Sequence, residues 1–224
     1  MACCYQMVYE RVCFIFSSNE YACEKDEKML MKTLANMKIN TYLYRNGTIA
    51  ILRDYIQSIV KKQRNASLVM VFIMTHTVTS TQVLISGELC ELKKIIDIID
   101  VPTLHEIPKL MFIQTNENYK SKYLDLENII SAWKNSSSQT LDLSSALKRT
   151  SSSPQKTLQL PSVIPANSVL MHSDLTGIDD VSEEGSPMIQ ILCKLFEKHA
   201  LSLDFESIIK LLNTAMEKYP NYTI

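Results

Sequence analysis

The sequence has few glycines and no strong charge of either sign. Only four of its 224 residues are glycine, and none belongs to a Gly-rich motif of the kind that holds phosphate groups in many α/β proteins. The net charge of -1 gives no electrostatic reason to expect a nucleic acid or an anionic membrane as partner. The usual sign of a nucleotide-binding α/β protein is therefore missing.

The sequence shows no metal-binding cysteine spacing, and its first residues do not predict a secretion signal. Its six cysteines include no C-x-x-C pair and no Cys/His pattern typical of zinc, so we expect no metal and no cofactor. Glu10 and Arg11 precede the first short apolar run, which disfavours both a signal peptide and a membrane-spanning helix. We therefore expect a cytoplasmic protein with reduced thiols and no membrane partner.

Strand-like and helix-like segments alternate along most of the chain. Apolar, β-favouring runs predict strands at 12–16, 40–44, 68–74, 109–114 and 168–171. Apolar residues recurring every three or four positions predict helices at 25–38, 49–64, 88–100, 188–199 and 204–218. The run 68–74 is apolar on both faces, which indicates helices on both sides of a mostly parallel sheet. The predicted fold class is a doubly wound, three-layer α/β fold.

One segment differs in composition from the rest. Residues 134–167 are rich in serine, contain three prolines and have few large side chains. Such a segment buries too little apolar surface to order itself, so we expect a flexible linker there.

Two strand ends and their spacing resemble the caspase family. VMVFIMTH is followed about forty residues later by IPKLMFIQTNEN, where caspases have a strand ending in Ser-His-Gly and a later one ending in Gln-Ala-Cys-Arg-Gly. Further on, SVLMHSD and GSPMIQILCKLFEKHALSLDFESIIKLLN resemble the start of the caspase small subunit. The resemblance implies a large-subunit-like region at 1–133, an intersubunit-type linker at 134–167 and a truncated small-subunit-like region at 168–224, together one domain.

The resemblance also indicates that the catalytic site is degenerate. His76 matches the catalytic histidine, but Asn116 stands where caspases have the nucleophilic cysteine. A cysteine protease needs a thiolate to attack the carbonyl carbon. Asparagine has no ionisable proton and a delocalised amide lone pair, so we expect no catalytic residue and no enzyme activity.

The substrate-binding residues are similarly incomplete. Gln114 matches the glutamine of the S1 pocket, the only one of its three residues that remains. The small-subunit arginine aligns with Asp179 and Asp180, and acidic side chains there would repel a substrate aspartate. The loop at 17–28 contains no arginine.

The carboxyl-terminal part predicts the kind of partner. The resemblance implies a last antiparallel edge strand, for which the sequence after 218 leaves no full length. The strand Ser168 to Met171 would then be an exposed edge to which a strand of a caspase or a caspase adaptor can add, whereas the usual homodimer is doubtful. We therefore expect a FLIP-like pseudocaspase that regulates apoptosis or related signalling by binding, either as an inhibitory decoy or as an activator.

Two alternatives remain open at this point. A diverged cysteine endopeptidase with a shifted nucleophile would use Cys90, at the start of the helix predicted for 88–100, or Cys193, although core-like spacing favours buried structural thiols for both. The other alternative is an α/β domain unrelated to cell death.

Overall fold

The computed structural model describes residues 10–17, 24–45, 48–62, 66–77, 81–85, 88–100, 102–116, 165–175, 185–219 and 222–223. The strands are β1 (Arg11–Ser17), β2 (Asn40–Arg45), β3 (Leu68–Thr77), β4 (Gln82–Ile85), β5 (Glu88–Glu91), β6 (Lys109–Asn116), β7 (Ser168–Leu175) and β8 (Tyr222–Thr223). The helices are α1 (Glu24–Asn36), α2 (Ile49–Lys62), α3 (Leu92–Ile99), α6 (Pro187–His199) and α7 (Phe205–Met216), with a short 3-10 turn at Pro102–Leu104. The linker predicted for 134–167 lies outside the described residues up to position 164, so it stays a prediction.

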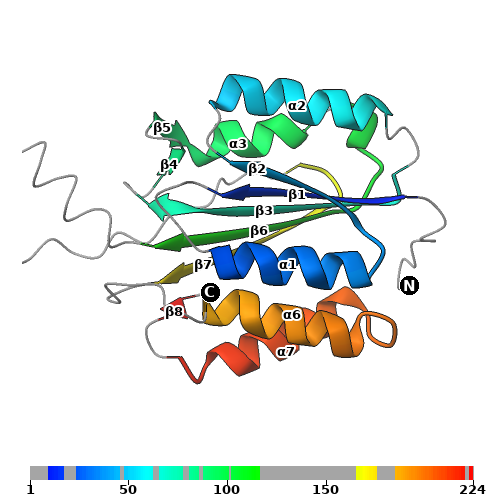
Figure 1. Cartoon of the computed structure of the whole chain (residues 1–224), viewed down its shortest axis with the longest axis vertical. Coiled ribbons are helices and arrows are strands. Elements are labelled where there is room, and N and C mark those ends of the chain that lie inside the picture. The colour runs from blue at the N-terminus through cyan, green and yellow to red at the C-terminus, as the bar shows by residue number, and fades with distance from the viewer. Residues whose placement is uncertain are drawn as a thin grey trace, which may run out of the picture.

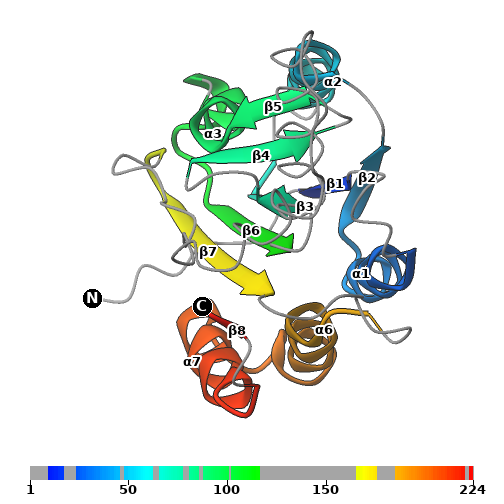
Figure 2. The ribbon, with the colours of Figure 1, turned by 90° about the vertical axis from the view of Figure 1, so that its left-hand side faces the viewer.

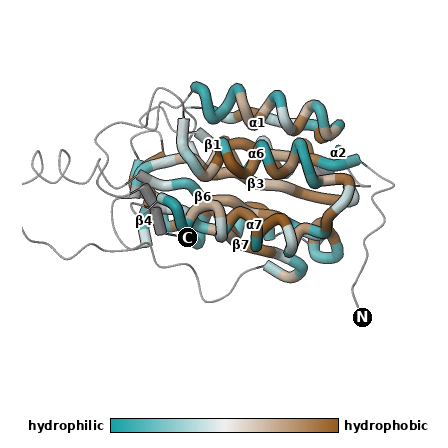
Figure 3. The backbone as a smooth tube through the Cα atoms, turned by 90° about the horizontal axis from the view of Figure 1, so that it is seen from below, coloured by the Kyte–Doolittle hydropathy of each residue, from teal (hydrophilic) through white to brown (hydrophobic). Residues whose placement is uncertain are grey.

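The described elements form three layers, as the apolar strands predict. Helices α2 and α3 cover one face of the sheet, and α1, α6 and α7 cover the other (Figure 1). Between them, Phe72 of β3 and Phe112 of β6 stack with ring centroids 4.6 Å apart. In Figure 3, β3 and parts of α6 and α7 are coloured hydrophobic. Burial on both faces explains why these strands read as continuous apolar runs.

The sheet has the order β2-β1-β3-β6-β7-β8, and its first five strands are parallel. The connection from β1 to β2 passes through α1 on one face, and the return from β2 to β3 passes through α2 on the other. The chain therefore changes direction across the sheet between β1 and β3. In open α/β sheets, ligands bind outside the carboxyl ends of the strands at such a point.

The segment 88–100 corrects one prediction. It is not helical throughout, because Glu88–Glu91 forms β5, which pairs antiparallel with β4 and leaves α3 to begin at Leu92. This hairpin branches from β3 through pairs such as His76 with Leu84 (Figure 2). Cys90 therefore lies in a strand and not at a helix start.

The last strand is shortened and not wholly missing. β8 has two residues and pairs antiparallel with the end of β7, where Thr223 lies beside Asp174 and Tyr222 beside Leu175. β7 itself extends to Leu175, four residues beyond the predicted strand end at Met171. The prediction of an absent edge strand is thus corrected to a two-residue remnant.

Candidate active-site edge of the sheet

The carboxyl ends of all five parallel strands lie at the same end of the sheet, on the left in Figure 1. This follows from the parallel topology, because parallel strands all run in the same direction. Polar residues that follow these apolar runs are therefore gathered there from distant parts of the sequence. The candidate site lies at this carboxyl end of the sheet.

His76 and Asn116 are direct neighbours across two adjacent strands. The two residues are paired in register between β3 and β6, which sets their Cα atoms about 4.8 Å apart, the usual spacing of neighbouring strands. His76 is buried, with 6% of its surface exposed. The structure thus brings together the two positions that the sequence predicts for the histidine and the lost nucleophile.

Two residues before this pair, a row of residues crosses the whole sheet. The row is Arg45, Ser17, Met74, Gln114 and Ser173, each in register with the next. Its side chains share the face that α1, α6 and α7 cover, because the alternate residues of the same strands belong to that core. The candidate site comprises this row and the pair His76–Asn116.

Gln114 is fixed in this row by backbone acceptors. Its Nε2 donates to the carbonyl oxygens of Thr115 at 3.2 Å and Ser173 at 3.4 Å. Both Gln114 Oε1 and Ser173 Oγ are buried without a hydrogen-bond partner among the described residues. Gln114 and Ser173 are thus a buried, neutral pair in register, with one unpartnered oxygen atom on each side chain.

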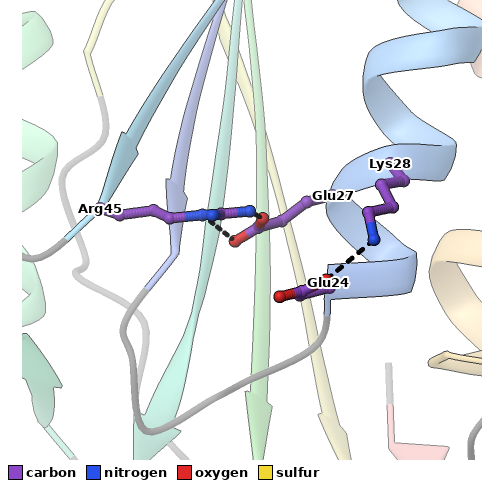
Figure 4. Close-up of polar contacts among 4 residues, drawn as sticks. All are labelled: Glu24, Glu27, Lys28 and Arg45. Carbon is purple, nitrogen blue, oxygen red and sulfur yellow. Dashed lines mark hydrogen bonds and ion pairs between the residues drawn. The ribbon is translucent and has the colours of Figure 1, made fainter.

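The same row contains a guanidinium group, that of Arg45, and this group is paired with the carboxylate of Glu27. Its Nε donates to Glu27 Oε1 at 3.1 Å, and its Nη2 donates to Glu27 Oε2, so the contact is bidentate (Figure 4). Glu27 is buried, whereas the Arg45 side chain is 44% exposed. A buried carboxylate needs such a partner, and the pairing largely satisfies the positive charge of Arg45.

The neighbouring carboxylate of α1 holds the start of α6. Asp26 is fully buried, and its Oδ1 accepts the backbone N–H of Ser186 at 2.8 Å. Gly185 just before it has φ +91°, and an added Cβ there would overlap the Asp26 carboxylate. Asp26 therefore joins the two sides of the sequence that the predicted linker separates.

A second buried histidine lies on the opposite face of the sheet. His172 Nε2 is 2.9 Å from Thr115 Oγ1, and both residues are buried. Burial lowers the pKa of His172 to about 4, because the charged imidazolium loses solvation. This residue is neutral near pH 7 and belongs to the packing of β6 against β7.

The described thiols are poor nucleophiles. Burial raises the pKa of Cys90 to about 11 and that of Cys193 to about 12, and it raises the pKa of Cys13 as well. The nucleophilic form of cysteine is the thiolate, which such pKa values nearly eliminate at neutral pH. The prediction of buried structural thiols at Cys90 and Cys193 is confirmed.

The sequence predicted part of this site and missed the rest. His76, Gln114 and Asn116 lie together, whereas Asp179 and Asp180 lie outside the described residues. Ser17 and Arg45 are polar residues at the ends of their strands, which is the available signal for them, whereas Ser173 lies two residues before the end of β7 and has no such signal. Glu27 had no such signal, because its partner comes from another element.

Within the described ranges, no group of three or more His, Cys, Asp or Glu side chains is placed to hold a metal ion. Those ranges also contain no helix that is both long and apolar enough to span a bilayer.

Comparison with known proteins defines the class. The caspase domain model matches residues 10–223, and the chain belongs to this family. A caspase-like protein of Trichoplusia ni ascovirus 2c is 30% identical over 218 residues, which cover 94% of this chain and 92% of that protein. A caspase-like protein of Heliothis virescens ascovirus 3e is 26% identical over 107 residues, 47% of this chain and 34% of that protein.

A solved structure shows the same fold. Caspase-1 from Spodoptera frugiperda matches with a TM-score of 0.59 and 15% sequence identity, over 95% of this chain and 79% of that one. The predicted caspase-like α/β fold is confirmed.

Proposed function

We propose that this chain is a non-catalytic caspase homologue that regulates apoptosis or related signalling by binding caspases or their adaptors in the cytoplasm. The observation that carries the proposal is the register pair His76–Asn116, because an amide residue stands beside the histidine where a thiol is needed. An amide cannot form the acyl-enzyme of a cysteine protease. A retained scaffold without its nucleophile is suited to occupy a partner and not to cleave a substrate.

A shifted nucleophile has less support. Cys90 is paired with Val83, which is paired with Thr77, so it lies two strands away from β3, about 10 Å at the usual strand spacing. His76 is paired with the next residue, Leu84, so Cys90 belongs to the other face of the hairpin. Cys193 packs in the core between α6 and the sheet. Neither arrangement favours the endopeptidase alternative.

The binding site that we propose for the partner is the outer edge of β7. In the described part of the chain, β8 pairs only with Asp174 and Leu175. The predicted edge Ser168 to Met171 therefore has no neighbouring strand on its outer side among the described residues. An edge of this kind can add a strand of a partner protein, and we propose a heterodimer with a caspase, in which the chain acts as an inhibitory decoy.

Mixing the full chain with an active caspase tests this function. With purified Spodoptera frugiperda caspase-1 as the probe, we expect co-migration on size exclusion and a decrease of its peptide hydrolysis as the chain is added. Co-migration with increased hydrolysis would support binding to the caspase but show that the chain activates it and does not inhibit it. Separate elution and unchanged hydrolysis would overturn the proposal.

A further inference from the structure

Among the described residues, the main sheet ends in β2 on one side and, where the two-residue β8 does not reach, in β7 on the other. These two strands differ in how they are protected. Natural edges commonly carry charged side chains, prolines or bulges that prevent unwanted strand addition. β2 ends in the exposed Arg45. The stretch Ser168–Ser173 of β7 contains no proline and no charged side chain, because His172 is neutral near pH 7. Its register with β6 is continuous, without a bulge. Among the described residues, β7 is thus the outer strand without these protective features, and its exposed part is the start at Val169, because Met171, His172 and Ser173 are buried.

One hydrogen bond determines which groups of β7 point outward. Lys109 N donates to Asn167 O at 2.8 Å. In a parallel ladder this contact means that the backbone groups of Val169, Met171 and Ser173 face β6. The N–H and C=O groups of the alternate residues therefore face outward: they belong to Ser168, Leu170 and His172, followed by Asp174, which is paired with β8.

We propose that Ser168–Ser173 of β7 receives an antiparallel strand of about six residues, donated by the caspase partner, in the same row as β8. This inference rests on the proposed function, and it specifies where and in which direction the partner binds. We assign the antiparallel direction by analogy with β8, which pairs that way at Asp174 and Leu175 in the same row. The six residues span about 20 Å, the length of an average strand.

The two faces of β7 determine the chemistry of the donated strand. Val169 is 44% exposed and lies on the same face as Met171, which packs with α6 and α7. Leu170 packs on the opposite face with the core under α3. Side chains that face Val169 and Met171 across the pair should be apolar, and a charged side chain there would lose its hydration without a counter-charge. The partner strand is therefore extended, uncharged and apolar at alternate positions.

Residue-resolved amide exchange tests the site with its own internal control. In the free chain, the amides of Val169, Met171 and Ser173 should be protected by β6, and those of Ser168, Leu170 and His172 should exchange faster. In the complex with Spodoptera frugiperda caspase-1, the exchange of the outward-facing amides of Ser168, Leu170 and His172 should slow by about tenfold or more. The exchange of the amides that face β6 should change little. If neither set changes in a complex that forms, the edge inference is overturned and the binding function stands.

A matched pair of lysine variants tests the same surface by affinity. Val169→Lys adds a charge to the outer strand, and Ile51→Lys adds the same charge to an exposed apolar position of α2, where Ile51 is 57% exposed. We expect Val169→Lys to bind the caspase about tenfold more weakly than the unchanged chain and Ile51→Lys to bind equally well. Equal binding of both variants would overturn the edge inference alone.

Two further outcomes are decisive. A chain that forms no complex at all would overturn both the edge inference and the proposed function. If Ser168, Leu170 and His172 become protected when the free chain self-associates at high concentration, a second copy fills the edge and the assignment to a caspase strand is wrong.

Discussion

At the scale of single residues, burial limits the reactivity of the cysteine and histidine side chains. Three cysteines and two histidines lie in the described core, and their surroundings exclude water instead of presenting reactive atoms to it. Among the described residues, no thiol is adjacent in register to His76. These cysteines and histidines therefore contribute to the packing of the described core.

The thiols give the first prediction. Native protein treated with iodoacetamide at pH 8 should be alkylated at Cys13, Cys90 and Cys193 at least about a hundredfold more slowly than unfolded protein, because burial keeps these groups protonated. Peptide mapping by mass spectrometry measures each site. Rapid alkylation of Cys90 or Cys193 in the native state would restore the shifted-nucleophile alternative.

His172 gives a pH prediction whose sign follows from its depressed pKa. The folded-state pKa of about 4 lies below the ordinary value of 6.5, so the unfolded chain binds the proton more readily. Burial of the neutral His172 therefore costs no protonation free energy above about pH 6.5, and the folded state loses stability relative to the unfolded chain as the pH falls from 6.5 towards 4. The difference between these two pKa values corresponds to about 3 kcal/mol in the free energy of unfolding.

Urea unfolding at several pH values measures this effect. The free energy of unfolding of the unchanged chain should fall between pH 7 and pH 4.5 more steeply than that of His172→Gln, which cannot take up a proton. Parallel curves for the two proteins would show that His172 is not the buried neutral group described above.

At the scale of elements, ion pairs and caps connect parts that are distant in sequence. Asp26 and Glu27, adjacent in the first turn of α1, bind the start of α6 and the end of β2 respectively. Thr33 further along α1 donates to Glu197 of α6 at 3.1 Å. One helix therefore positions both elements that border the candidate site.

The pair of Glu27 with Arg45 is expected to stabilise this arrangement. Arg45→Gln leaves a buried carboxylate without its cation and should lower the free energy of unfolding by about 2 kcal/mol, less than for a fully buried pair because Arg45 is half-exposed. The double variant Glu27→Gln/Arg45→Gln should recover part of this loss. Lys28→Gln is the matched control, since the Lys28–Glu24 pair is exposed on both sides, and its removal should leave stability unchanged. Equal effects of Arg45→Gln and Lys28→Gln would contradict this account.

The elements also show what the sequence predicts and what it does not. The strands β1, β3 and β6 are predicted because a strand buried on both faces is a continuous apolar run, whereas β2, which is only partly buried, is predicted from its alternating side chains. The hairpin of β4 and β5 is missed because the spacing of Leu89 with Leu92 and Ile96 also fits a helix. β7 is predicted too short because its last residues are polar, and only contacts such as Thr115 with His172, 57 positions apart, show why they belong to the strand.

At the scale of the whole molecule, one caspase-like sheet collects residues from both sides of the predicted linker. The register of β3, β6 and β7 brings His76 beside Asn116, and Gln114 beside Ser173. The sequence predicts which of these positions correspond to a caspase site through the family resemblance. It does not predict the bidentate contact of Arg45 with Glu27, because that contact depends on how α1 packs beside β2.

The account depends most on the absence of a covalent nucleophile, and peptide hydrolysis measures this directly. Purified chain at micromolar concentration should hydrolyse substrates with aspartate before the scissile bond no faster than buffer, because Asn116 cannot form an acyl-enzyme. An Asn116→Cys variant assayed in parallel shows whether a thiol at that position is sufficient to restore activity. Turnover by the unchanged chain that is lost when one of its cysteines is replaced would contradict the account.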